Sequence, residues 1–280
     1  MTIRELLICC CSLLLSVSLP TAYAAENAGH AIGEARDLKN DEFLYREVYC
    51  SNGNPDEVEV IYSNETGKLL ARKLLDYRSG PTTPSFVQQN FYSSEVIEVG
   101  LLDGQVTMKV LDAVSSEPKK VSSTQTDDRL PVVIDAGFDE FVRSHWNSLV
   151  SGEKKRFLFP FAERDSLVEL RIRPAACSYP SETDQCFKLE IANWFVRMLV
   201  KPIELGYDPE LRRLTRYRGL SNIGDGSGNG LVVDIRYDYQ DEPAQACGLN
   251  QARVYPDRVY SDRVYPDRVD PANPRGEDKS

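Results

Sequence analysis

Residues Val96–Leu111 read VIEVGLLDGQVTMKVL, two apolar runs joined by Asp103-Gly104. An Asp-Gly pair between two such runs is a strong signal for a tight β-hairpin, because both residues tolerate the positive φ that the turn requires. In the second run, apolar residues stand at every second position from Val106 onward. Strands that alternate in this way bury one face and favour antiparallel pairing. The hairpin therefore predicts a sheet built from short, local connections.

The same alternation recurs through the body of the chain. Clear instances are Phe157–Phe161, Val168–Ile172, Phe187–Ile191 and Leu231–Tyr237, and further strands are expected at Val58–Tyr62, Leu69–Tyr77 and Arg213–Arg218. Turn residues separate several of them, as at Asn64–Gly67 and Tyr207–Glu210. The expected fold class is mainly β (α+β): an antiparallel meander that forms a barrel or half-barrel with one covering helix.

One segment has the period of a helix. Its apolar stripe consists of Phe138, Phe141, Val142, His145, Trp146 and Leu149. Residues at this spacing share one helix face, so we expect a helix that starts at Asp135 and ends at Gly152. It should cover a sheet face or plug a barrel end. A shorter helical turn is expected at Trp194–Val200, although a strand suits that stretch equally well.

The N-terminus has the features of an export signal. Met1–Arg4 is basic, Leu6–Leu19 is apolar, and Ala22–Ala24 gives the small-residue pattern of a cleavage site before Ala25. Lipidation at Cys9 is a weaker alternative. We expect residues 1–24 to be a signal peptide, 25–40 a flexible lead-in, 41–247 an antiparallel β domain and 248–280 a disordered tail. The protein is accordingly expected in the periplasm or secreted.

Composition restricts the partners. The formal charge is −10 and the sequence pI is near 4.9, which argues against nucleic acid as a partner. No stretch after the signal is apolar over the roughly 20 residues of a membrane helix, so no integral membrane segment is expected after cleavage and the mature protein should be soluble. The tail repeats a five-residue unit from Arg253 to Asp267, rich in Pro and alternating charge, which is typical of disordered chain.

Four cysteines remain once Cys9–Cys11 leave with the signal, and an even number suits an oxidising space. Cys177 and Cys186 flank a short loop between two expected strands, so they are expected to pair. By elimination, Cys50 would pair with Cys247 and mark the boundary of the ordered domain. The absence of a Cys-x-x-Cys spacing disfavours a redox enzyme or a zinc ribbon.

The sequence contains no motif complete enough to assign a catalytic residue, a metal ligand or a cofactor. Gly219–Ile223 matches only half of a nucleophile elbow, and the histidines are His30 and His145, the latter on an apolar helix stripe. Asp225–Gly230 begins like a calcium loop, but Arg236 occupies the twelfth place, where a glutamate is needed. The basic run Lys154–Arg156 is most simply the polar start of a strand, with anion or lipopolysaccharide contact as a lesser alternative.

Several longer motifs carry a resemblance. Ala71–Tyr77 followed by Pro84–Phe86, then Asp135–Trp146, and finally Tyr207–Pro209 with Tyr217–Ile223, resemble an exported bacterial protein family of unknown function. The resemblance covers most of residues 43–240 and implies no activity. The C-terminal repeat and the Cys177/Cys186 pair stand outside it. The strand-rich layout is also similar to periplasmic antiparallel half-barrels that bind lipid or another apolar ligand, an analogy at the level of the fold alone.

Two functional hypotheses follow. The first is a noncatalytic envelope protein that binds a lipid or another amphiphile or supports an envelope assembly, with its protein partner unspecified. The alternative is a hydrolase acting on envelope material, which would need a polar cleft with two facing acids of shifted pKa. A binder would instead need an apolar cavity. The expected lining of that cavity is Phe157, Phe159, Phe161, Leu170 and Ile191.

Overall fold

The computed structural model describes residues 31–51, 54, 56–126, 129–225, 230–240 and 247. Its strands are β1 (Ala31–Asp37), β2 (Phe43–Ser51), β3 (Glu57–Ser63), β4 (Leu69–Asp76), β5 (Ser85–Asn90), β6 (Glu95–Leu102), β7 (Gln105–Asp112), β8 (Pro118–Gln125), β9 (Lys155–Phe161), β10 (Ser166–Pro174), β11 (Gln185–Ile191), β12 (Ile203–Tyr207), β13 (Leu214–Gly224) and β14 (Gly230–Tyr239). The helices are α2 (Gly137–Ser144), α3 (Trp146–Val150) and α4 (Trp194–Arg197), with short 3-10 turns η1 (Tyr77–Ser79) and η2 (Ala162–Arg164).

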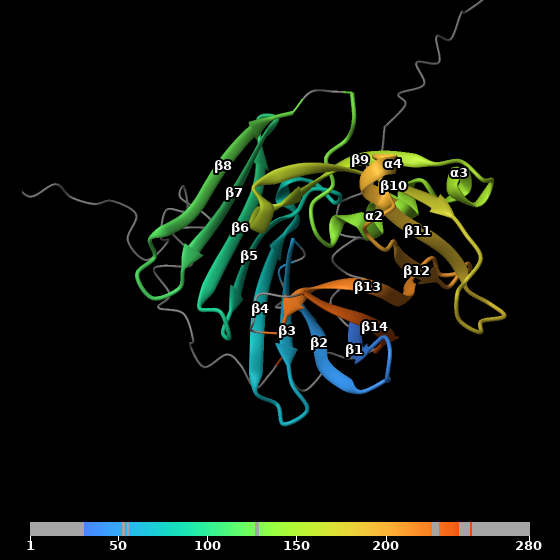
Figure 1. Cartoon of the computed structure of the whole chain (residues 1–280), viewed down its shortest axis with the longest axis horizontal. Helices are drawn as coiled ribbons and strands as arrows, with labels where there is room; N and C mark the ends of the chain where they lie inside the picture. The colour runs from blue at the N-terminus through green and yellow to red at the C-terminus, as the bar shows by residue number, and fades with distance from the viewer. Residues whose placement is uncertain are drawn as a thin grey trace, which may run out of the picture.

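The strands form one antiparallel sheet of 14 strands in the order β8-β7-β6-β5-β4-β3-β2-β1-β14-β13-β12-β11-β10-β9. β1 and β14 pair at its centre, so the two halves of the chain wind outward from that seam to the edges β8 and β9. Figure 1 shows blue β1 beside orange β14, with β8 at the far left and β9 across the top. Because β8 and β9 do not pair with each other, the sheet is an open half-barrel. This architecture confirms the predicted fold class.

The sheet curls so that its β9 end packs against the inner face of β6 and β7. Val132, Ile134 and Ala162 lie in one buried cluster with Val99 and Met108 of those strands. The segment before α2 runs along the edge of β9, where the Val133 and Leu158 amides donate to Leu158 and Pro131 carbonyls at 2.9 Å. Side-chain packing therefore brings the two ends of the sheet together without strand pairing between them.

The predicted helical stripe is confirmed, but the helix is broken at His145. Phe141, Val142, Trp146 and Leu149 are buried against the inner face of β9–β13. His145 has a φ of −105°, and its Nδ1 lies 2.8 Å from the Phe141 carbonyl oxygen. The start predicted at Asp135 is wrong as well, since α2 begins two residues later and Asp135 has a φ of 43°. The expected turn at Trp194 is the short helix α4.

The predicted domain start at residue 41 is also wrong, because Ala31–Asp37 forms β1. Its inward residues are Ala31, Gly33 and Ala35, which are too small to show an apolar alternation. A Cβ on Gly33 would lie 2.8 Å from Glu47 Cγ and 2.9 Å from Tyr237 Cε1, so larger neighbours fill the space above this strand. Residues 25–30 of the expected lead-in, the signal at 1–24 and the tail at 248–280 lie outside the described residues.

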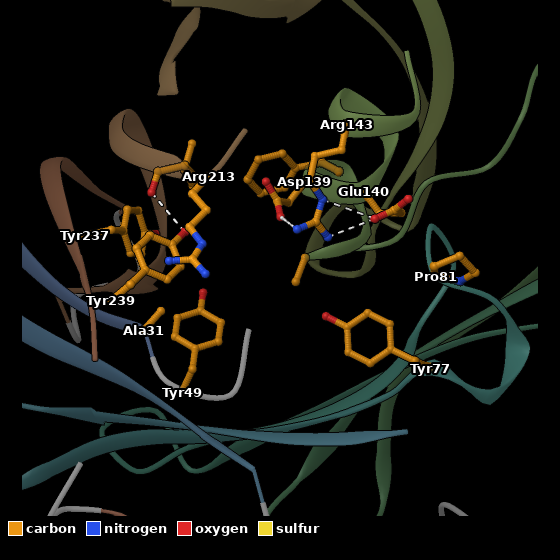
Figure 2. A pocket seen from close by; sticks show the side chains of 13 residues that line it. Ala31, Tyr49, Tyr77, Pro81, Asp139, Glu140, Arg143, Arg213, Tyr237 and Tyr239 are labelled. Carbon is orange, nitrogen blue, oxygen red and sulfur yellow. Dashed lines mark hydrogen bonds and ion pairs between the residues drawn. The ribbon is translucent and has the colours of Figure 1, made fainter. Parts of the chain in front are cut away.

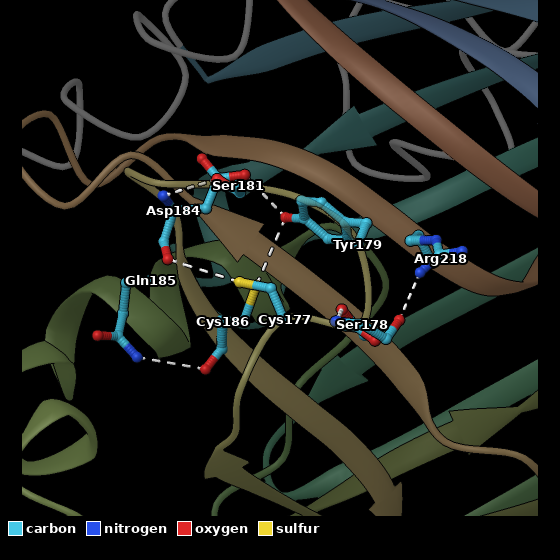
Figure 3. The surroundings of a disulfide bond; sticks show 9 residues. Cys177, Ser178, Tyr179, Ser181, Asp184, Gln185, Cys186 and Arg218 are labelled. Atoms are coloured by element: carbon cyan, nitrogen blue, oxygen red, sulfur yellow. Dashed lines mark hydrogen bonds between the residues drawn. A yellow bond between two sulfur atoms is a disulfide. The ribbon is translucent and has the colours of Figure 1, made fainter.

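Both predicted disulfides are present, Cys50–Cys247 and Cys177–Cys186. Cys50 lies on the outer face of β2 in a small cluster with Val48 and Ile61. Figure 3 shows the second bridge beside Tyr179, whose hydroxyl donates to Asp184 Oδ2 at 2.8 Å. Two formed bridges indicate an oxidising compartment.

Candidate functional site

The concave face of β14 and β1–β5 contains an unusual number of polar side chains. Strand register places two rows side by side across the sheet: Tyr237, Gly33, Glu47, Tyr62, Ala71 and Asn90, and next to it Tyr239, Ala31, Tyr49, Val60, Lys73 and Gln88. Glu47, Lys73, Gln88 and Asn90 are all buried. Buried polar groups are costly unless they are paired, so this belt must be held by specific bonds.

Glu47 is at the centre of one such set of bonds. Its side chain is 3% exposed and accepts a hydrogen bond from the Tyr237 hydroxyl at 2.6 Å, with the Tyr49 hydroxyl at 3.4 Å. Burial raises the pKa of Glu47 to about 7, against the opposing effects of the Tyr237 bond and the Lys73 charge. Glu47 is therefore expected to titrate near neutral pH, and its carboxyl is hydrogen-bonded to two tyrosines of the pocket wall.

A buried ion pair ties the sheet to the segment that leads into α2. Lys73 Nζ donates to Asp135 Oδ1 at 2.7 Å and Oδ2 at 2.8 Å, and Lys73 is only 2% exposed. Ile134 N donates to the Thr82 carbonyl at 3.0 Å, and a Cβ on Gly137 would lie 2.2 Å from that oxygen. Gly137 is thus required by the close approach of two backbones. Together these contacts fix where α2 starts above the sheet.

A pocket lies between α2 and the sheet at this point, with a cavity volume of about 70 Å³. Its wall is formed by Ala31, Tyr49, Tyr77, Pro81, Ala136, Phe138, Asp139, Glu140, Arg143, Arg213, Leu214, Tyr237 and Tyr239. Figure 2 shows Tyr49 of β2 and Tyr77 of η1 on one side of the pocket, and Asp139, Glu140 and Arg143 of α2 on the other. The pocket is therefore aromatic on the sheet side and charged on the helix side.

The charges at the pocket balance one another. Arg143 lies 2.8 Å from Glu140 Oε2 and 3.4 Å from Asp139 Oδ2. Burial raises the pKa of Asp139, and the Arg143 charge opposes that rise. The Arg213 guanidinium lies 5.1 Å from the ring centre of Tyr239, as in a cation–π contact. The rim has no formal net charge, because it combines the two cations Arg143 and Arg213 with the two acids Asp139 and Glu140.

The pocket is small for a ligand site. Sites that enclose a whole small molecule usually measure a few hundred Å³. A cavity of about 70 Å³ can receive one end of a molecule, such as a ring or the end of an acyl chain, while the rest stays at the rim. A second hollow of about 230 Å³ lies on the outer face of β5–β7, where Gly100 leaves a gap beside the Lys109–Glu98 pair. It brings together fewer polar groups than the first.

The structure places the five predicted cavity residues elsewhere. Phe157 and Leu170 are buried in the core beneath α2 and α3, and Phe159 and Ile191 pack against the same core. Phe161 lies at the end of β9 with its ring 5.2 Å from that of Phe159. None of the five lines either hollow.

The polar belt formed by these two rows was not predicted, although the sequence carries a signal for it. Glu47 lies in phase with Tyr45 and Tyr49, and Lys73 lies in phase with Ala71 and Leu75. A charged residue in the inward phase of a strand is rare unless it is paired, and it marks a position to examine. His145 stands on the apolar helix stripe as expected, and its ring centre lies 4.3 Å from that of Phe141.

Within the described residues, no three His, Cys, Asp or Glu side chains are grouped closely enough to hold a metal ion. Most of the calcium-like loop at Asp225–Gly230 lies outside those residues. Across the same described part of the chain, no helix has the length and apolar character to span a membrane.

Neither a protein-family model nor a curated protein matches the chain. A solved structure described as a β-barrel-like protein of domain of unknown function DUF1849, from Brucella abortus, is similar at 13% sequence identity. The match covers 77% of this chain and 99% of that chain, with a TM-score of 0.47.

Proposed function

We propose that the protein is a noncatalytic, exported binding protein whose pocket holds one end of an amphiphilic ligand. The observation that carries this proposal is the pocket between α2 and the sheet. It has an aromatic wall of Tyr49, Tyr77, Tyr237 and Tyr239 facing a rim of balanced charge. Such a wall suits an apolar group, and a rim with no formal net charge suits a neutral or zwitterionic head.

The bonds behind the wall support binding because they hold it in place before a ligand arrives. Tyr237 donates to Glu47, and Tyr239 donates to the Leu214 carbonyl at 3.0 Å. A wall that is already ordered loses little conformational entropy on binding. Both rim carboxylates, Asp139 and Glu140, are engaged with Arg143, which also favours recognition over acid–base chemistry.

Ligand binding is tested first by native mass spectrometry of the purified protein, followed by organic extraction. A retained amphiphile is expected in the extract. Titration with dodecylphosphocholine below its micelle-forming concentration then measures the affinity, with decanoate and decyltrimethylammonium as anionic and cationic comparisons. The zwitterionic probe is expected to bind more tightly than either charged probe.

A pair of matched variants locates the binding. Phe138→Asp places a charge on the pocket wall, whereas Val114→Asp places the same charge on the exposed turn between β7 and β8. The first should weaken dodecylphosphocholine binding by about tenfold or more, and the second should leave it unchanged. Equal binding by wild type and Phe138→Asp, with both folded by circular dichroism, would exclude this pocket.

One observation favours the alternative, a hydrolase of envelope material. Glu47 has a pKa raised to about 7 by burial, within the range of a general acid, and the Asp135 charge contributes to that rise. The assay is release of dye from labelled peptidoglycan by wild type and Glu47→Gln. Release that disappears in Glu47→Gln would support the hydrolase, and no release by wild type would count against it.

A further inference from the structure

The connection between β11 and β12 exposes a run of large apolar side chains. It contains α4, and Trp194, Phe195, Val196, Met198, Leu199 and Val200 are each more than 40% exposed. The most exposed are Phe195 at 65%, Met198 at 74% and Leu199 at 85%. None of the six belongs to a hydrophobic cluster of the described residues. We call residues 192–202 the apolar loop.

The shape of the apolar loop is fixed by polar bonds, so its apolar side chains are not needed to hold it. The Asn193 side chain accepts from Phe195 N at 3.0 Å and Val196 N at 3.4 Å, and Arg197 N donates to the Asn193 carbonyl at 3.0 Å. Other strongly exposed apolar residues stand apart from one another: Leu102 is at the end of β6, and Val114 is in the turn between β7 and β8. A contiguous exposed apolar patch marks an interaction surface.

The charge around the apolar loop is opposite in sign to that of the protein. The chain has a formal charge of −10, yet residues 192–202 include Arg197 and Lys201 and no acidic residue. Their neighbour on β11 is Glu190, which pairs with Arg171 at 2.6 Å, Arg173 at 2.8 Å and Arg197 at 4.0 Å.

The carboxyl of Glu190 is surrounded by more positive charge than it can neutralise. Burial tends to raise its pKa, but hydrogen bonds from Arg173 and Arg171 outweigh burial and hold the pKa below its usual value. Glu190 is therefore ionised, and three arginines share its single negative charge. This outer surface keeps a positive excess directly beside the exposed apolar side chains.

We propose that the apolar loop docks on a lipid bilayer that contains anionic phospholipids. Trp194, Phe195 and Leu199 would enter the interfacial layer, where aromatic and aliphatic side chains are favoured. Arg197 and Lys201 would meet the phosphate groups, as long basic side chains do at membrane surfaces. Because the rest of the protein is acidic, an anionic surface attracts this region and repels the remainder, which orients the molecule.

The test is flotation of the full chain with vesicles of phosphatidylethanolamine and phosphatidylglycerol, beside vesicles of phosphatidylcholine alone. Wild type is expected to float with the anionic vesicles. The double variant Phe195→Asp/Leu199→Asp should lose about tenfold or more of that binding. Lys201→Gln should lose about fivefold on anionic vesicles and little on phosphatidylcholine.

A matched control separates the loop from the general effect of added charge. Leu102→Asp/Val114→Asp introduces the same two charges at side chains that are 75% and 88% exposed. It should bind the vesicles as wild type does, and thermal unfolding should be the same in all four proteins.

Failure of wild type to float, or equal flotation of Phe195→Asp/Leu199→Asp and wild type, overturns the proposal. A dimer in solution that is abolished by Phe195→Asp/Leu199→Asp, without any flotation of wild type, assigns the loop to a second copy of the chain instead. The pocket is formed by other residues, so neither result bears on amphiphile binding there.

Discussion

At the scale of single residues, Glu47 makes the stability of the fold depend on pH. Its folded-state pKa of about 7 lies above the ordinary 4.5, so the folded chain binds the proton more tightly than the unfolded chain. The resulting stabilisation is complete below the unfolded pKa and is lost as pH rises through about 7. The difference between the two pKa values corresponds to roughly 3 kcal/mol.

Glu47→Gln removes this titration while keeping an acceptor for the Tyr237 hydroxyl. Between pH 5 and pH 8, wild type should lose up to about 3 kcal/mol more of its free energy of unfolding than the variant does. Urea denaturation at both pH values measures the difference, and comparing the two proteins cancels the other titrating groups. Parallel pH dependence in the two proteins would show that Glu47 does not titrate in this range.

The Lys73–Asp135 pair gives a second prediction at this scale. Lys73→Met leaves the Asp135 carboxylate unpaired, and Asp135→Asn leaves a buried ammonium group unpaired. Each should cost about 3–5 kcal/mol in the free energy of unfolding. The double variant should cost much less than the sum of the two, because neither charge is then left alone. Additive losses in urea denaturation would contradict the coupling.

These residues also show why the sequence did not reveal the site. Alternation along β2 separates Tyr45, Glu47 and Tyr49 from Arg46 and Val48, but it does not say which set faces the concave side. Val48 is also buried, in the outer cluster that contains Cys247, so both faces of the strand look like core. Asp135 is far from Lys73 in the chain, and its partner could not be inferred from spacing. The pocket could be recognised only once the fold was known.

At the scale of elements, prediction succeeded where one face was apolar and the other wet. The hairpin β6–β7 and the stripe of α2 and α3 meet that condition. β1 lacks a recognisable apolar face, because its inward residues are small. β8 lacks one as well, since nearly all of its residues are exposed and only its pairing with β7 makes it a strand. Lysines on β8 are typical of an edge strand that avoids further pairing.

The two tryptophans give a matched test of the helical elements. Trp146 of α3 is 6% exposed and lies edge-on to the rings of Phe187 at 5.6 Å and Tyr207 at 5.8 Å. Trp146→Ala should lower the free energy of unfolding by about 3–5 kcal/mol. Trp194→Ala, in exposed α4, should change it by less than about 0.5 kcal/mol. Guanidinium denaturation compares them, and a large loss in Trp194→Ala would mean that α4 belongs to the core.

At the scale of the whole molecule, the strand order within each half follows from local hairpins, but the seam does not. β1 and β14 are far apart in the chain, and no sequence feature of either strand indicates that it pairs with the other. The Cys50–Cys247 pairing predicted by elimination was the available hint, because it brings the end of β14 toward β2. Short-range sequence patterns are least able to specify long-range strand pairing of this kind.

The two disulfides should therefore differ in what they stabilise. Cys50–Cys247 spans 197 residues and holds the central seam, whereas Cys177–Cys186 spans 9 residues beside one hairpin. The chain-entropy model gives about 5 kcal/mol for the long loop and about 3 kcal/mol for the short one. Cys50→Ala/Cys247→Ala should lower the free energy of unfolding more than Cys177→Ala/Cys186→Ala does. Hydrogen exchange should show faster opening of β1, β2 and β14 in the first variant, and of residues 175–186 alone in the second. Equal exchange at the seam in both variants would mean that strand pairing and packing hold the two halves together without the bridge.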